Sequence, residues 1–141
     1  AHISLPAVSG DNTPASLSEP VLTGLLRETL GYDGVIITDA LDMGAIVQNY
    51  GTEQACVQAL KAGADMLLMP ADPQAGFNAV LEAVRNGEIS EERLDASVER
   101  ILETKEKYGL FESSVLTDPS VLGCEEHQAI VQDIREQAEN R

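Results

Sequence analysis

The sequence predicts an α/β protein with a parallel sheet, because short apolar runs alternate with amphipathic helical patterns along residues 1–110. Two of these runs, 35–38 and 66–69, are apolar at consecutive positions, which is typical of parallel strands buried on both faces. The connections are short, so right-handed crossovers would place every helix on a covering face of the sheet. An open doubly wound sheet and a closed barrel both satisfy this order, and no G-x-G-x-x-G turn favours a dinucleotide-binding fold.

The first strand and the first helix are predicted before the buried runs. Segment 1–5 has the pattern of a strand end that is closed by a proline. Because the sequence opens inside this strand and without Met, we expect the chain to be a piece of a longer protein. A helix is then predicted over 14–30, with Ser18 as its N-cap and Pro20 in its first turn. Gly31 supplies the left-handed stop after it.

Three further helices are predicted between and after the two buried runs. The first begins at a Thr52 cap and ends at Gly63, and the second covers 73–84 behind an Asp72 cap. The third runs from a Ser90 cap to a closing glycine. The resulting order is strand, helix, strand, helix, strand, helix, helix, as expected for successive β-α-β units.

The C-terminal region has a different pattern. Residues 113–120 are rich in Ser, Thr, Asp and Pro, which is typical of a linker, and 125–139 predicts a final helix. One side of that helix is apolar and has no evident partner inside the chain: Ile130, Val131, Ile134 and Ala138. We therefore expect a first region over 1–110 and a second over 111–141.

The chain is strongly acidic, with 9 Lys and Arg against 24 Asp and Glu in 141 residues and a formal charge of −15. This charge would repel a phosphate backbone, so nucleic acid is not expected as a partner. No apolar stretch reaches the roughly 18 to 20 residues of a membrane-spanning helix, so no span is expected. Cys56 and Cys124 lie far apart without metal-ligand spacing, and the sequence has no phosphate loop, nucleophile elbow or metal-ligand cluster.

Asp39 is the residue that points to chemistry, since it is a carboxylate directly after a buried parallel strand, where α/β proteins place ligands and catalytic groups. The spacing fits Asp39 equally well as the N-cap of a helix over 40–47. Asp42 would be a first-turn residue of that helix. His2, at the end of the first strand, could face the same rim as Asp39, whereas Asp65 would enter its strand at the opposite rim, where stability is the usual role.

Several motifs occur in a fixed order along residues 14–102. They are Pro14-Ala15-Ser16-Leu17-Ser18, Leu30-Gly31-Tyr32-Asp33-Gly34, Thr38-Asp39-Ala40-Leu41-Asp42-Met43, Ala62-Gly63-Ala64-Asp65-Met66, Arg93-Leu94-Asp95 and Arg100-Ile101-Leu102. Taken together, this sequence resembles glycoside hydrolase family 3, most closely its β-N-acetylglucosaminidase branch.

The resemblance implies a TIM-type (β/α)8 barrel, in which 1–5, 35–38 and 66–69 would be strands six, seven and eight. It also implies that Asp39 is the nucleophile of a Thr/Ser-Asp-x-x-x-Met motif. Met43 completes that motif, and Met43 and His2 would contact the substrate. The acid/base of this branch is a His paired with an Asp on a loop of an earlier strand, and no stretch of this sequence matches that loop.

The function implied by the resemblance is retaining cleavage of β-N-acetylglucosaminides, such as cell-wall fragments, with neither a metal nor an organic cofactor. The region from 111 onward would be a linker and the first helix of a following domain. Since the acid/base loop is absent, we expect the isolated chain to be inactive unless other chains or self-association supply the rest of the barrel. The alternative is a non-catalytic remnant that acts only through association with other chains.

Overall fold

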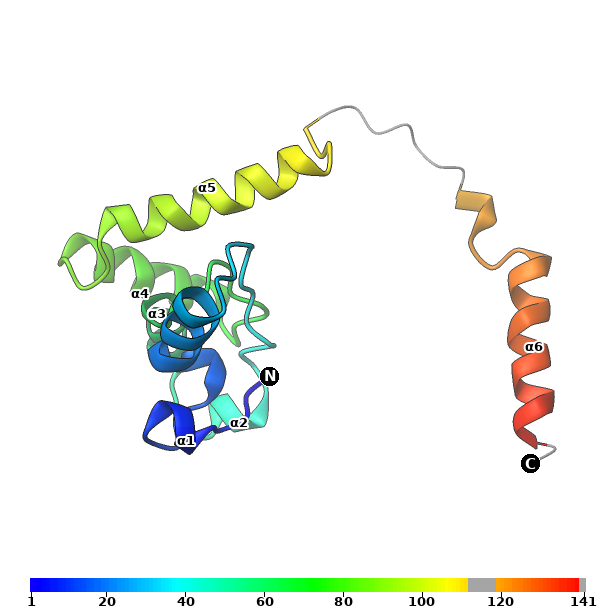
Figure 1. Cartoon of the computed structure of the whole chain (residues 1–141), viewed down its shortest axis with the longest axis horizontal. Helices are drawn as coiled ribbons and strands as arrows, with labels where there is room; N and C mark the ends of the chain where they lie inside the picture. Colours follow the sequence, from blue (N-terminus) through cyan, green and yellow to red (C-terminus); the bar gives the residue numbers. More distant parts are fainter. Residues whose placement is uncertain (112–118, 140–141) are drawn as a thin grey trace. The chain divides into compact units, whose positions relative to one another are not determined.

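The computed structural model describes residues 1–111 and 119–139 of the chain. It contains two compact units, Ala1–Gly109 and Leu110–Arg141 (Figure 1). Residues 112–118, which make up most of the expected linker, lie outside the described residues.

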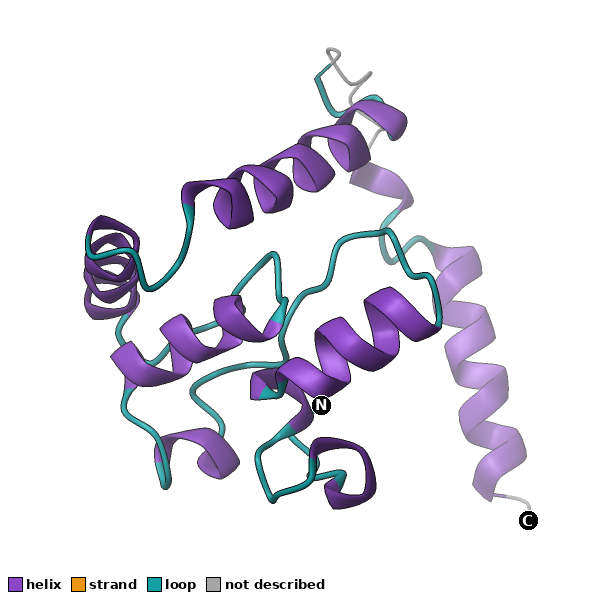
Figure 2. Ribbon diagram, turned by 60° about the vertical axis from the view of Figure 1, so that its left-hand side comes forward, coloured by secondary structure: helices purple, strands orange, loops and turns teal. Residues whose placement is uncertain are grey.

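The first unit is built from helices joined by extended and irregular segments (Figures 1 and 2). Its helices are α1 (Pro6–Ser9), the 3₁₀-helix η1 (Ala15–Leu17), the π-helix η2 (Pro20–Thr29), α2 (Gly44–Val47), α3 (Thr52–Ala62), α4 (Pro73–Arg85) and α5 (Glu91–Lys107). The second unit contains a 3₁₀-helix η3 (Pro119–Val121) and α6 (Glu125–Glu139). The helix expected over 125–139 is confirmed, and its apolar side chains Ile130 and Ile134 are exposed.

The three expected strands do not form in the part of the chain that the structure describes, and Figure 2 draws helices and loops only. The segments 35–38 and 66–69 instead meet in one isolated parallel bridge, between Ile37 and Met66. Segment 1–5 forms its own bridge, antiparallel, between Ser4 and Pro14. The parallel direction of the first pair agrees with the prediction. A ladder does not develop because a sheet is stable only when several strands pair along a shared apolar face.

The helix expected over 14–30 is wrong in its start and in its geometry. It begins at Pro20 and is a π-helix, in which the N–H of Leu30 donates to the carbonyl of Leu25 over 2.9 Å. The hydroxyl of Thr29 also donates to the carbonyl of Gly24, five residues earlier, over 2.8 Å, which favours this wider turn. Ser18 does not cap the helix, and its buried hydroxyl has no hydrogen-bond partner among the described residues.

The later helices lie close to the positions predicted from the sequence. Asp72 caps α4 by accepting hydrogen bonds from the backbone N–H groups of Gln74 and Ala75, both over 3.0 Å. Ser90 caps α5 by accepting from the N–H of Arg93 over 3.2 Å. Thr52 is the first residue of α3, and its side chain does not cap the helix as expected, because Gly51 precedes it in an extended conformation.

The core of the first unit forms around α3. Its inner face contributes Ala55, Cys56 and Ala59, which pack with side chains from η1, η2, the 35–41 segment and α2: Leu17, Leu22, Ile36, Leu41 and Ile46. These side chains are withdrawn from water, which is the main stabilising contribution in a domain of this size. A smaller cluster of Leu60, Ala83 and Ile89 joins α3 to α4 and to the turn that follows it.

Not every apolar side chain of this unit is covered. Ile37, Met66 and Met69 belong to the two segments expected as buried strands, yet they are 52%, 42% and 57% exposed. None of the helices in 1–111 and 119–139 combines the length and apolarity that crossing a membrane requires.

Candidate active site

Asp39 follows the segment 35–38 and is half-buried. Its Oδ1 accepts a hydrogen bond from the backbone N–H of Ala40 over 2.9 Å. The reading of Asp39 as a helix N-cap is wrong, because the next helix, α2, begins only at Gly44 and is preceded by Met43. Asp42 lies before this helix too and is exposed, so its expected first-turn position is also wrong. Asp39 therefore has no capping role that would explain its carboxylate.

His2 lies beside the residue that follows Asp39. Its Nε2 is 2.8 Å from the carbonyl oxygen of Ala40, and its Nδ1 is 2.6 Å from the hydroxyl of Ser16. A carbonyl oxygen can only accept, so Nε2 carries a proton in this arrangement. The structure thus brings His2 to the same loop as Asp39, as the strand-end argument predicted, although both ring nitrogens are engaged by the protein itself.

Met43 lies four residues after Asp39, at the entry to α2. Its carbonyl accepts from the N–H groups of Ile46 and Val47 over 2.8 and 3.1 Å, which begins the helix. Its side chain is 45% exposed. Asp39 and Met43 therefore bracket one short loop, and His2 is hydrogen-bonded to that loop from another part of the chain.

A buried ionic network centred on Asp65 was not predicted from the sequence. The side chain of Asp65 is 0% exposed and forms ion pairs with Arg27, Arg93 and Arg100. The Arg100 nitrogen is 3.1 Å from Oδ1, the Arg93 nitrogen is 3.8 Å from it, and the Ser97 hydroxyl donates to it over 2.6 Å. A signal was present, because residues 93, 97 and 100 lie on one face of a helix at spacings of four and three.

This network also holds the segment that leads to Asp39. The Oδ2 of Asp65 accepts from the backbone N–H of Ile36 over 2.8 Å, three residues before Asp39. Arg27 donates to the carbonyls of Tyr32 and Gly34, over 3.0 and 2.5 Å, and so fixes the chain entering the segment.

Burial lowers the pKa of the Arg93 guanidinium, while the adjacent Asp65 carboxylate raises it and the neighbouring arginines lower it further. Three guanidinium groups thus form ion pairs with one buried carboxylate. Removing that carboxylate would leave positive charge that no neighbouring acid in this network compensates.

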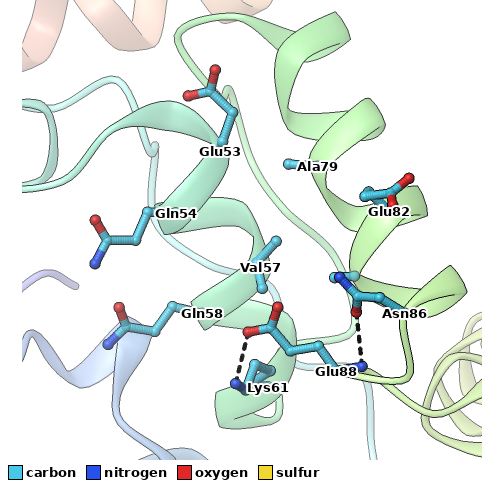
Figure 3. Close-up of a pocket in the computed structure, with 10 residues that line it drawn as sticks. Glu53, Gln54, Val57, Gln58, Lys61, Ala79, Glu82, Asn86 and Glu88 are labelled. Atoms are coloured by element: carbon cyan, nitrogen blue, oxygen red, sulfur yellow. Dashed lines mark hydrogen bonds and ion pairs between the residues drawn. The ribbon is translucent and has the colours of Figure 1, made fainter.

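Two cavities of the first unit are large enough to hold a small ligand. One, of about 530 Å³, is lined by His2 together with Ser4, Asn12, Asn49 and Tyr50, and neither Asp39 nor Met43 is among its lining residues. The other, of about 650 Å³, is a groove between α3 and α4 that Figure 3 shows, where Lys61 pairs with Glu88 over 2.9 Å. None of the predicted site residues lines the groove, and of those residues only His2 lines the first cavity. Within the described ranges, no group of three or more His, Cys, Asp or Glu is placed to hold a metal ion.

Comparison with known proteins defines the class of the chain. The model of the glycosyl hydrolase family 3 N-terminal domain matches residues 1–104. The chain therefore belongs to glycoside hydrolase family 3. This confirms the resemblance drawn from the motifs, including that to β-N-acetylglucosaminidases.

Individual relatives support the same assignment. The solved structure of a glycoside hydrolase family 3 β-N-acetylglucosaminidase from Paenibacillus sp. str. FPU-7 is 45% identical, with a TM-score of 0.79 over 84% of this chain and 23% of that chain. A β-N-acetylglucosaminidase/β-glucosidase from Cellulomonas fimi is 31% identical over 94% of this chain and 26% of its own length. A lysosomal β-glucosidase from Dictyostelium discoideum is 41% identical over 72% of this chain and 13% of its own length. The chain thus spans about a quarter or less of the length of these relatives.

Proposed function

We propose that this chain contributes the nucleophile to a retaining glycosidase that cleaves β-N-acetylglucosaminides. The observation that carries the proposal is the state of the Asp39 carboxylate. Ala40 holds its Oδ1, whereas no hydrogen bond within residues 1–111 and 119–139 reaches its Oδ2, and no helix end accounts for the residue. A carboxylate with one oriented oxygen and one free oxygen is suited to attack an anomeric carbon.

The chemistry requires two displacements. In the first, an Asp39 oxygen forms a bond to the anomeric carbon as the bond to the leaving oxygen breaks, and a general acid protonates that oxygen. In the second, water attacks the anomeric carbon, the general base takes its proton, and the bond to Asp39 breaks. The acid/base belongs to a loop that this sequence does not match, so a second carboxyl- or imidazole-bearing segment must supply it, about 5 Å from Asp39 in a retaining enzyme.

We propose that the remaining strands of the domain come from another chain or from self-association. Ile37 and Met66, which form the parallel bridge between segments 35–38 and 66–69, are about half exposed. Beyond the bridge the two segments are joined by separate hydrogen bonds, such as that from the N–H of Leu41 to the carbonyl of Leu68, and no further strand is paired with them in the described residues. An apolar, unpaired edge of this kind is a surface on which further strands add. The region after 110 would then lead into a following domain.

The choice of sugar rests on the relatives. Both the Paenibacillus and the Cellulomonas proteins carry β-N-acetylglucosaminidase in their names, which favours that substrate, and a role in cell-wall recycling would follow from it. The Cellulomonas and Dictyostelium names also include β-glucosidase, so β-glucosides are the second candidate substrate. A non-catalytic role through association alone is the alternative that the exposed apolar edge favours.

An activated substrate tests the nucleophile without the missing acid. A dinitrophenyl β-N-acetylglucosaminide needs no protonation of its leaving group, so attack by Asp39 would release dinitrophenolate and leave a glycosyl adduct visible as a mass increase. We expect the adduct on a peptide containing Asp39, and its loss in Asp39→Asn. Asp42→Asn, an exposed neighbour on the same loop, is the matched control and should still label. Labelling that survives in Asp39→Asn would overturn the proposal, and the dinitrophenyl β-glucoside in parallel decides the sugar.

A further inference from the structure

His2 and Ser16 form a hydrogen-bonded pair that reaches the backbone next to Asp39. The Nδ1 of His2 is 2.6 Å from the buried Ser16 hydroxyl, and its Nε2 is 2.8 Å from the Ala40 carbonyl oxygen, 38 residues along the chain. Because that carbonyl only accepts, Nε2 donates. In the neutral imidazole Nδ1 then accepts, and the Ser16 hydroxyl donates to it. The Ala40 carbonyl thereby selects the tautomer of His2, and the bond to Ser16 helps to fix the rotation of the ring.

Ala40, the residue that His2 contacts, is hydrogen-bonded through both its N–H and its carbonyl group. The Ala40 N–H donates to Oδ1 of Asp39 over 2.9 Å, and the Ala40 carbonyl accepts from His2. The N–H of Leu41, which lies in the same peptide unit as that carbonyl, donates to the carbonyl of Leu68 over 2.9 Å. The Ala40 carbonyl also accepts from the N–H of Met43 over 3.2 Å. A rotation of the Ala40–Leu41 peptide would break the contacts to His2, Met43 and Leu68 together, so this unit is fixed relative to the Asp39 carboxylate.

We propose that His2 is a positioning residue for Asp39, acting through the Ala40 carbonyl, and that Ser16 orients His2 for this task. This inference rests on the proposed role of Asp39 as the nucleophile. It replaces a sugar contact through the His2 ring nitrogens, because a sugar hydroxyl could take either nitrogen only by displacing Ser16 or Ala40. Positioning of this kind matters because reacting groups must be held close to the productive geometry.

Two substitutions at residue 2 separate the contact to Ala40 from mere occupation of the site. In His2→Gln the amide nitrogen is at about the reach of Nε2 and can still donate to the Ala40 carbonyl. In His2→Asn the shorter amide reaches about as far as Nδ1 and retains only the side near Ser16. The exposed His127 in α6 provides the control substitution, His127→Asn.

Nuclear magnetic resonance of the complete chain measures the effect of each substitution on the environment of Asp39, and this measurement does not require catalysis. The signals to follow are the Asp39 carboxyl carbon and the Leu41 amide nitrogen, whose peptide includes the Ala40 carbonyl. We expect both to shift in His2→Asn, to return toward their original positions in His2→Gln, and to stay unchanged in His127→Asn. In the unsubstituted chain, the His2 Nε2 proton should exchange with water at least about fivefold more slowly than that of His127, as one net hydrogen bond implies.

The outcomes are distinct from those of the labelling experiment. Asp39 and Leu41 signals that are the same in both His2 variants would overturn the positioning role, as would equal exchange of the two imidazole protons. If Ser16→Ala leaves the His2 exchange rate unchanged, the orienting role of Ser16 is wrong. Labelling that persists in Asp39→Asn would remove the nucleophile while leaving the His2 measurements intact, so the two failures can be told apart.

Discussion

Arg100 forms an ion pair with the wholly buried carboxylate of Asp65, with the two charged atoms 3.1 Å apart. Arg100 is anchored from its own helix as well, because the same nitrogen donates to the carbonyl of Ala96 over 3.1 Å. The pair ties α5 to the end of α3, and the second oxygen of Asp65 ties both to Ile36. One carboxylate therefore links the C-terminal helix of the first unit to the segment that presents Asp39.

The first prediction concerns this carboxylate. Asp65→Asn keeps the shape of the side chain but leaves Arg27, Arg93 and Arg100 without their counter-charge. We expect the free energy of unfolding to fall by about 3–5 kcal/mol, which is typical when one partner of a buried ionic network is removed. Urea denaturation followed by circular dichroism measures it. Glu88→Gln, which breaks the exposed Lys61–Glu88 pair, should cost at most about 1 kcal/mol. Equal effects of the two substitutions would contradict the central role of Asp65.

A second prediction comes from the close packing of α3 against α4. A Cβ added at Gly76 would lie 2.7 Å from the Sγ of Cys56, so Gly76→Ala should overpack the interface and destabilise the protein by about 1–3 kcal/mol. Cys56→Ala removes the opposing sulfur. The double variant should therefore lose less stability than the sum of the single variants, in a double-mutant cycle by thermal denaturation.

The control for this cycle is Gly24→Ala in η2, where an added Cβ meets nothing within 4 Å. That substitution should be neutral or slightly stabilising, since alanine favours helical backbone over glycine. Additive effects of the Gly76 and Cys56 substitutions would show that the two residues do not interact.

A third prediction uses the two cysteines. Cys56 is 1% exposed, and burial, with a smaller contribution from the charge of Glu53, raises the pKa of its thiol. Cys124 is half-buried. A maleimide reagent at neutral pH should therefore modify Cys124 readily and Cys56 only when the first unit opens. Mass spectrometry of the two peptides over time checks this, and rapid labelling of Cys56 under native conditions would contradict the packed α3–α4 interface.

The same thiol gives a pH dependence with a definite sign. A pKa that is higher in the folded state than in the unfolded state means that the folded protein retains the proton longer. The contribution of Cys56 to stability is then complete below the unfolded pKa and is lost as pH rises through the folded pKa. Stability should fall over that alkaline range, and Cys56→Ala should remove this part of the decline.

The parts of the fold that the sequence predicted well are those decided by neighbouring residues. Asp72 and Ser90 cap α4 and α5 through N–H groups two or three residues away, so spacing alone was sufficient to place the two helices. The expected strands failed because a ladder depends on distant partners, and Ile37 and Met66 form a single bridge. The π geometry of η2 was missed because it depends on which carbonyl the Thr29 hydroxyl selects.

For the candidate site too, single residues could be predicted from local patterns, whereas contacts between distant residues could not. Asp39 could be singled out because it follows an apolar run, and His2 because it lies just inside the end of the first predicted strand. The two residues come together because His2 contacts the carbonyl of Ala40, 38 residues further along the chain. No local sequence pattern specifies a contact between a side chain and a backbone carbonyl at that separation. The Asp65 network was overlooked for a related reason, since its arginines come from η2 and α5 and only the fold brings them together.

The last prediction concerns the exposed apolar edge. The side chains of Ile37, Met66 and Met69 are about half exposed. Fully burying a side chain of this kind contributes about 1.5–3 kcal/mol, so covering the exposed half of each would contribute about 1 kcal/mol. If further strands or a second copy bind there, the purified chain should associate as its concentration rises, and Ile37→Thr combined with Met66→Gln should weaken that association at least about tenfold. Sedimentation velocity over a concentration series measures it. Leu30→Gln, which alters a side chain of similar exposure after η2, is the matched control and should leave association unchanged. A chain that stays monomeric at every concentration would show that self-association does not cover the edge, which would leave further strands from another chain to do so.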